Sequence, residues 1–190
     1  ITDEAGNTAS CSFTVTVTDE EDPTITCSED ATITTSNLGT TGDCAGQYEW
    51  DHPLPSDNCG IEDFDIVYTN PDGTIDGPFN AIQISEGSIG TTANRHFAVG
   101  ITTVTYYIVD ASGNSASCDF TVTVTDDEDP TFVNCPEGVI FTVGLFSDDC
   151  TGGAIWSIPI AEDNCSATVM QTDGPAQGEI LPVGTYPIQY

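Results

Sequence analysis

The sequence repeats itself over most of its length, and this internal repeat is the feature that most constrains its fold. The segment at 1–27, ITDEAGNTASCSFTVTVTDEEDPTITC, matches the segment at 108–135, IVDASGNSASCDFTVTVTDDEDPTFVNC. Shorter matches pair LPSDNCG at 54–60 with IAEDNCS at 160–166, so the period is about 107 residues. A period of that length corresponds to one domain of about 100 residues, the usual size of a β-sandwich.

The repeat predicts three parts in the 190 residues. Residues 19–125 form a complete unit, and residues 126–190 form a second unit that lacks its last strand. Residues 1–18 are the final strands of a unit, and they would complete residues 126–190 of an adjoining copy. We therefore expect copies of the chain end to end, either in one continuous polypeptide or as separate chains that donate a strand to a neighbour. The close match of the first strands to the repeat favours the continuous polypeptide.

An insertion at about 70–96 distinguishes the first unit from the second. Forty residues separate Cys59 from Val99, whereas 18 separate Cys165 from Val183. Gly, Asn, Thr and Pro are the main residues that interrupt strand patterns in the insertion. Its AIQIS stretch predicts a short strand. We interpret the insertion as a surface loop, with a lateral contact between copies as the functional alternative.

Alternating apolar and polar residues predict strands along each unit. CDFTVTVT at 118–125 and CSFTVTVT at 11–18 place Cys, Phe and two Val residues on one face. The sequences DASGN at 110–114 and DEAGN at 3–7 predict tight turns before these strands. Further strands are predicted at 47–53, 61–68 and 104–110, and no segment has a helical period. The fold class is therefore an all-β sandwich.

The charge balance restricts the kind of partner. The sequence holds 31 acidic residues, one arginine (Arg95) and no lysine, for a formal net charge of −30. Nucleic acids and anionic membranes attract Lys and Arg, so we expect neither as a partner. No apolar run is long enough to span a bilayer, so no membrane insertion is expected in this segment. The balance favours high solubility, cation binding or a salty medium.

Eight cysteines recur at regular spacings without a CxxC pair. This pattern favours disulfides in an oxidising, extracellular compartment over a zinc site. Strand parity points Cys27 and Cys118 into one sandwich, so we pair them. Cys135 then requires the equivalent of Cys118, which is Cys11 of an adjoining copy.

The remaining four cysteines fall into two short loops. Each loop spans 15 residues, which predicts the local disulfides Cys44–Cys59 and Cys150–Cys165. An alternative set of pairs runs across the joints and joins Cys11 to Cys27 and Cys118 to Cys135.

The sequence offers few groups for catalysis. Without lysine there is no Schiff base, and His52 has no Ser or Cys nucleophile in a recognisable elbow. Carboxylates abound, but acid–base catalysis requires two environments that separate their pKa values. We expect no enzymatic activity. Trp50 and Trp156 occupy equivalent positions of the repeat and are predicted to be core residues.

The order of these motifs resembles the hyalin repeat, or HYR domain. The shared series is an acidic joint ending in Pro, TC or NCP, a loop Cys, DNC, VG and DxxGNxAxCxFTVTVTD, over the whole chain. The four-cysteine form with DNC is similar to very large, tandemly repeated bacterial surface proteins, including adhesins of gliding Bacteroidetes. The family also occurs in animal extracellular matrix and complement-type proteins. The resemblance implies two tandem immunoglobulin-like β-sandwiches, an extracellular adhesive role and no enzymatic activity.

Clustered acids at the joints predict calcium, which takes six to eight oxygen ligands. In an immunoglobulin-like sandwich, the loops after the second and sixth strands lie at the end where the chain enters. The expected ligands at the first joint are Asp19, Glu20, Glu21, Asp22, Asp57, Asn58, Asp110 and Asn114. At the second they are Asp126, Asp127, Glu128, Asp129, Asp163 and Asn164, with Asp3 and Asn7 of the adjoining copy. Without metal, the joints would be solvated hinges with Asx-turns.

These features predict a structural repeat of an extracellular filament or a long cell-surface adhesin stalk. Disulfides would staple each unit, and calcium would rigidify the joints. The alternative is a ligand-binding adhesion module that recognises a glycan or a protein receptor through sandwich loops. An exposed Trp or Tyr in the insertion would favour that alternative, and the insertion has neither.

Overall fold

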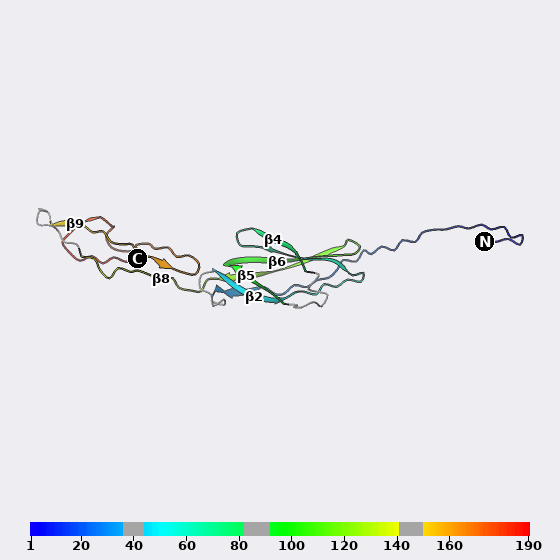
Figure 1. The fold of residues 1–190 in the computed structure, drawn as a ribbon, viewed down its shortest axis with the longest axis horizontal. Helices are drawn as coiled ribbons and strands as arrows, with labels where there is room; N and C mark the ends of the chain where they lie inside the picture. The colour runs from blue at the N-terminus through cyan, green and yellow to red at the C-terminus, as the bar shows by residue number, and fades with distance from the viewer. Residues whose placement is uncertain (36–43, 82–91, 141–149) are drawn as a thin grey trace. The chain divides into compact units, whose positions relative to one another are not determined.

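The computed structural model describes residues 1–35, 44–81, 92–140 and 150–190 (Figure 1). These residues are all-β, without an α-helix in the described ranges. The strands are β1 (Ala31–Thr34), β2 (Ala45–Asp51), β3 (Ile61–Thr69), β4 (Ile75–Asn80), β5 (Thr92–Ala98), β6 (Gly100–Asp110), β7 (Ser115–Thr125), β8 (Thr131–Phe132), β9 (Thr151–Gly153), β10 (Ala161–Glu162) and β11 (Ile180–Pro182).

Five strands form the main sheet, in the order β1-β7-β6-β3-β4. β2 and β5 form a separate two-stranded sheet, and the short pairs β10-β8 and β11-β9 form two more. β3 runs antiparallel to both β4 and β6, with a register shift in each pairing. These open sheets are consistent with a β-sandwich.

The alternation predicted for the two longest strands is confirmed by their burial. Along β6, Val104, Tyr106 and Ile108 are fully buried, and the residues between them are more exposed. Along β7, the buried face carries Phe120 and the valines that follow it. One face of each strand therefore contributes to the core, as a period of two requires.

Trp50 of β2 packs on the main sheet and so ties the two sheets of the first sandwich together. Its ring lies 6.4 Å from the ring of Tyr68 and 5.9 Å from the ring of Phe120, both edge-on. Its indole N–H donates to the Tyr106 hydroxyl at 2.9 Å. Trp50 and Trp156 are 5% and 8% exposed, so both are core residues as predicted.

The chain divides into two compact units. The first comprises Ile1–Ala31, Glu49–Asn94 and Thr102–Thr121, and the second comprises Thr32–Tyr48, Arg95–Ile101 and Val122–Tyr190. Each unit is discontinuous in sequence. The division into repeats at residues 18 and 125 stays a prediction.

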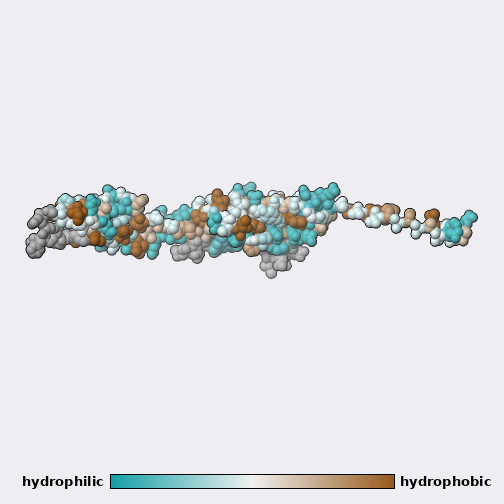
Figure 2. Space-filling view, turned by 90° about the horizontal axis from the view of Figure 1, so that it is seen from above, coloured by the Kyte–Doolittle hydropathy of each residue, from teal (hydrophilic) through white to brown (hydrophobic). Residues whose placement is uncertain are grey.

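Residues 11–18 differ from their counterpart in β7, because they form no strand. Phe13 is 87% exposed and Val17 is 90% exposed, whereas the equivalent Phe120 and Val124 are each 2% exposed. In Figure 1 the blue N-terminal segment runs without a strand beside it, and Figure 2 shows apolar, brown residues on its surface. The predicted strand is therefore wrong for this chain by itself. None of the strands in the described ranges pairs with its backbone.

The Cys27–Cys118 disulfide is confirmed, with Cα atoms 5.6 Å apart. The second disulfide instead joins Cys44 to Cys165 within the second unit, so the predicted local bonds Cys44–Cys59 and Cys150–Cys165 are wrong. Seven extended residues of β2, each rising about 3.3 Å, lie between Cys44 and the loop that carries Cys59. That length exceeds the Cα separation of about 7 Å that a disulfide tolerates.

The other four cysteines, Cys11, Cys59, Cys135 and Cys150, are exposed free thiols. The alternative pairing of Cys11 with Cys27 is also contradicted, because Cys27 is bonded to Cys118. The same bond contradicts the alternative pair of Cys118 with Cys135.

The insertion at 70–96 is described in part. β4 (Ile75–Asn80) extends the edge of the main sheet, and β5 (Thr92–Ala98) pairs with β2. Most of the AIQIS strand predicted within the insertion, residues 82–85, lies outside the described residues. Within the described ranges, no helix is long and apolar enough to cross a membrane.

Candidate functional site

The first acidic joint lies beside two loops of the first unit. Asp19 in the joint, Asp57 after β2 and Asp110 at the end of β6 place carboxylate oxygens within 4.8 Å of one another. The structure thus brings together three of the six acids expected to bind calcium at this joint. β6 ends at Asp110, and the loop between β2 and β3 carries Asp57, so a strand end and a loop bring these two acids to the joint.

A tight turn holds the Asp110 carboxylate. The Asn114 backbone N–H and side-chain amide each donate to it at 2.7 Å, and the Ser112 N–H donates at 2.9 Å. Burial of this fully buried residue acts to raise its pKa, but the hydrogen bonds from Asn114, Ser112 and Gly113 together outweigh burial and lower the pKa. The turn therefore keeps a buried carboxylate in its charged form.

The DNC loop holds the second acid. Asp57 accepts the Cys59 backbone N–H at 2.7 Å, which is the Asx-turn expected for DNC. The neighbouring Asn58 donates to Glu21 of the joint at 2.7 Å. The Cys59 thiol donates to Asp19, and this hydrogen bond, with burial and the surrounding carboxylates, raises the pKa of Cys59. The loop thus contacts the joint through several side chains.

Two oxygens of this cluster are buried without a hydrogen-bond partner, Asp19 Oδ2 and Asp57 Oδ2. Buried polar atoms are nearly always satisfied, so each such exception needs an explanation. Two carboxylates at this separation repel by about 3 kcal/mol per pair at an effective dielectric of about 20. A cation in the cluster would both satisfy the oxygens and offset the repulsion.

A second cluster lies at the second joint. Asp126, Asp163 and Cys165 place ligand atoms within 4.8 Å of one another, and Asn164 Oδ1 is buried without a partner. Cys165 is in a disulfide, so it offers no thiolate. Its backbone N–H donates to Asp163 at 2.9 Å, as in the first DNC loop. This cluster holds two carboxylates where the first joint holds three.

The turn that would supply the third carboxylate is already formed. Asn7 donates to Asp3 through its backbone N–H at 2.7 Å and its side chain at 2.8 Å, which repeats the bonds between Asn114 and Asp110. The side-chain hydrogen bond from Asn7 is the main cause that lowers the pKa of Asp3. Asp3 belongs to neither cluster within the described part of this chain.

The remaining acids expected at the joints lie outside both clusters. Thr35 donates to Asp126 at 3.1 Å and to Asp127 at 3.4 Å, which connects the end of β1 to the second joint. The residues that the described clusters do not include are Glu20, Glu21, Asp22, Asp127, Glu128 and Asp129.

A buried network around Tyr106 was missed from the sequence. The Tyr106 hydroxyl lies 2.9 Å from Trp50 Nε1 and 2.6 Å from His52 Nδ1. Burial raises the pKa of Tyr106 and lowers the pKa of His52, against the opposing charge of Asp51. His52 therefore serves as a hydrogen-bond partner of the buried Tyr106 hydroxyl. The available signal was that Trp50 and Tyr106 have counterparts at equivalent positions of the repeat, Trp156 and Tyr190.

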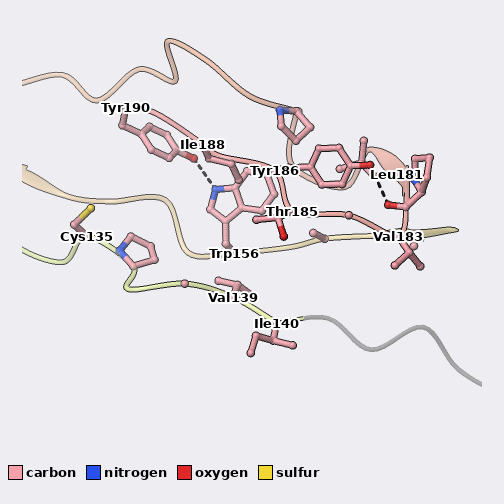
Figure 3. A pocket seen from close by; sticks show the side chains of 17 residues that line it. Cys135, Val139, Ile140, Trp156, Leu181, Val183, Thr185, Tyr186, Ile188 and Tyr190 are labelled. Carbon is pink, nitrogen blue, oxygen red and sulfur yellow. Dashed lines mark hydrogen bonds between the residues drawn. The ribbon is translucent and has the colours of Figure 1, made fainter. Parts of the chain in front are cut away.

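An apolar groove of about 570 Å³ opens in the second unit (Figure 3). Trp156 lies at its centre and donates to the Tyr190 hydroxyl at 2.7 Å, which repeats the bond from Trp50 to Tyr106. The walls come from residues 135–140 on one side and residues 181–190 on the other. In the first sandwich, the corresponding tryptophan is covered by Phe120 of β7. The equivalent of Phe120 is Phe13, which is exposed.

Comparisons with known proteins agree with the resemblance seen in the sequence. Residues 66–124 match the HYR domain family. The hyalin of Lytechinus variegatus is 32% identical over 194 residues, which covers the whole chain and 31% of that relative. The hyalin of Strongylocentrotus purpuratus is 34% identical over 195 residues, which covers the whole chain and 14% of that relative.

A third relative matches over half of the chain. It is the sushi, von Willebrand factor type A, EGF and pentraxin domain-containing protein 1 of Rattus norvegicus. The two sequences are 32% identical over 94 residues, and the match covers 2% of the length of that relative. The chain therefore spans less than a third of the length of each of these relatives. No solved structure matches it. The match at 66–124 and the two hyalins that align along the whole chain support the HYR family for this chain.

Proposed function

We propose that the chain is a structural segment of an extracellular fibre or stalk in which immunoglobulin-like sandwiches stand end to end. Residues 1–18 of one copy complete the sandwich of residues 126–190 of the preceding copy. The two disulfides fit an oxidising, extracellular compartment, because such bonds persist there. The hyalin relatives support the same family context.

One observation carries this proposal: the chain has an unpaired strand sequence and a groove that lacks a strand. Phe13, Val15 and Val17 are exposed, although their counterparts in β7 are buried in the first sandwich. The groove around Trp156 is apolar and corresponds to the position that β7 fills in the first sandwich. Strand addition would bury both surfaces and pair the open backbone edge.

The free cysteines support the same register. Cys11 and Cys135 are exposed thiols, and their counterparts Cys118 and Cys27 form a disulfide inside the first sandwich. Cys135 lies at the edge of the groove (Figure 3). Insertion of residues 8–18 from an adjoining copy would bring a Cys11 to this Cys135, so the joint within the sandwich becomes covalent.

The strand-completion step is tested by Phe13→Asp. A charge placed against Trp156 in the groove would remain buried without a partner, at a cost of several kcal/mol. We expect sedimentation velocity to show end-to-end oligomers for the wild type and monomers for the variant. The matched control is Ser12→Asp, on the opposite face, where the counterpart in β7 is the exposed Asp119. If Phe13→Asp associates as the wild type does, residues 1–18 do not enter the groove.

We further propose calcium at the joints, held by Asp19, Asp57 and Asp110 at the first. The support is the close approach of three carboxylates and the two buried oxygens without partners. The second site would be completed by Asp3 of the adjoining copy, whose turn already has the geometry of the turn at Asp110. A cation that bridges the joint to the loops would stiffen it.

Calcium is tested by thermal unfolding with Ca²⁺ and with EDTA. We expect Ca²⁺ to raise the unfolding temperature, since ligand at about 100 times its Kd stabilises by about 2.7 kcal/mol. Asp57→Asn removes one ligand charge and should lose most of this shift. Asp119→Asn changes the net charge equally at an exposed position of β7 and should keep it. Equal unfolding temperatures of the wild type in Ca²⁺ and EDTA would contradict the site.

A further inference from the structure

We propose that Cys150 of one copy forms a disulfide with Cys59 of the copy that follows it, so that every joint of the array carries a covalent staple. The inference rests on the proposed end-to-end array. Its template is the Cys44–Cys165 bond, which joins the segment before β2 to the DNC loop after β10. In sequence, this bond links the repeat at 19–125 to the repeat that follows it.

Cys150 has the backbone environment of Cys44. Their φ angles are +48° and +43°, a left-handed conformation that is uncommon outside glycine. The carbonyl of Cys150 accepts the Val183 N–H at 3.1 Å, and the carbonyl of Cys44 accepts the Val99 N–H at 3.2 Å. The two cysteines therefore occupy the same position of the repeat and have the same backbone conformation. Cys44 is bonded and Cys150 is free.

Cys59 has the environment of Cys165. Each backbone N–H donates to the aspartate two residues earlier, at 2.7 Å for Cys59 and at 2.9 Å for Cys165. Each sulfur also lies at an acidic joint. Cys165 Sγ is within 4.8 Å of ligand oxygens of Asp126 and Asp163, and the Cys59 thiol donates to Asp19. Cys59 is thus the free equivalent of a cysteine that is bonded across a joint.

The local alternatives do not fit the same geometry. β2 separates Cys44 from the DNC loop of its own repeat, and β9 and β10 likewise lie between Cys150 and Cys165. A cysteine before this strand therefore faces the next joint along the chain and not its own DNC loop. The Cys150–Cys59 bond would leave none of the eight cysteines unpaired once Cys11 and Cys135 have also joined.

The bond forms by oxidation with an external disulfide. A thiolate of Cys59 attacks the oxidant, which gives a mixed disulfide and releases one thiol. The thiolate of Cys150 then displaces the second thiol. Two protein thiols become one disulfide, and the oxidant, a low-molecular-weight disulfide such as oxidised glutathione, is reduced to two thiols that take up the two protons.

Disulfide mapping of mixed light and ¹⁵N-labelled chains tests the proposal, after assembly with oxidised glutathione and Ca²⁺. A glutamate lies between every two successive cysteines, so a Glu-specific protease releases each cysteine on its own peptide. We expect a Cys59 peptide linked to a Cys150 peptide, with light–heavy pairs that show the bond to join different chains. Cys150→Ser should leave Cys59 open to alkylation, whereas Cys11→Ser should not remove the Cys59–Cys150 link from chains that still associate.

The outcomes separate this inference from the proposed array. Chains that oligomerise and form Cys11–Cys135 links, but leave Cys59 alkylatable, overturn the staple and keep the array. Cys59 linked to Cys44, or Cys150 linked to Cys165, also overturns the staple. Chains that remain monomeric, with neither intermolecular link, overturn both proposals.

Discussion

Trp50→Ala is expected to destabilise the first sandwich by about 3–5 kcal/mol, a large part of the 5–15 kcal/mol that a domain usually has. The ring is 5% exposed and is packed edge-on against Tyr68 and Phe120, so truncation leaves a cavity between the two sheets. It also removes the indole N–H that donates to the Tyr106 hydroxyl, and this hydroxyl then keeps its hydrogen bond with His52. The free energy of unfolding from urea titration, followed by circular dichroism, measures the loss.

Trp156→Ala is the matched comparison, because Trp156 makes the same bond to Tyr190 in a groove that lacks its strand. Both substitutions are made in the Phe13→Asp background, which keeps the chain unassembled. We expect a clearly smaller loss of unfolding free energy at Trp156. Phe13, the counterpart of Phe120, is exposed and cannot pack on this ring. Equal losses at the two tryptophans would mean that residues 126–190 form a complete core without a donated strand.

Replacing Cys27 and Cys118 with serine is expected to cost about 2–5 kcal/mol, the range for a native disulfide of a small secreted domain. The bond closes a loop of 91 residues, and a loop of that length restricts the unfolded chain more than a short one does. The bond also ties the chain that enters the sandwich to β7. Urea unfolding under non-reducing conditions should show the loss as a lower midpoint, with a steeper slope because the unfolded chain without the bond is less compact.

The control is Cys11→Ser in the Phe13→Asp background, because Cys11 is exposed and free in the single chain. We expect its unfolding midpoint to equal that of the background. A reductant also breaks Cys44–Cys165, so it should bring the background and the double variant in the same background to a common midpoint. A double variant that unfolds at the background midpoint without reductant would show that the bond contributes nothing to the folded state.

The strands that the sequence predicted best are those in which pairing and burial agree. β6 and β7 alternate strictly and lie inside the main sheet, so pattern and environment give the same answer. Residues 11–18 have the same pattern, but a pattern specifies only which face is apolar. A strand also requires a neighbour, and none of the described strands pairs with this segment.

The disulfides show a second limit of sequence reasoning. Parity of residues along the strand places Cys118 of β7 correctly. Cys27 lies before β1 and outside the strands, and it pairs with Cys118 as predicted. A short sequence separation misled the assignment of Cys44, because β2 (Ala45–Asp51) is extended and carries the chain away from Cys44. The local rise of the backbone, not the number of residues, decides which thiols meet.

Three of the acids predicted to meet at the first joint lie close together, and their role as metal ligands stays a prediction. Asp57 and Asp110 were predictable because DNC and DASGN are turns with a defined hydrogen-bond pattern, and both patterns occur. Which of the four consecutive acids of the joint would turn inward was not predictable. The joint is an exposed segment without periodicity, and only Asp19 reaches the cluster.

Electron microscopy of the chain, under oxidising conditions with Ca²⁺, tests the end-to-end array most directly. The account predicts unbranched filaments of globular units in line for the wild type, and single particles for Phe13→Asp. Isolated particles of the wild type, or filaments of Phe13→Asp that match those of the wild type, would contradict it.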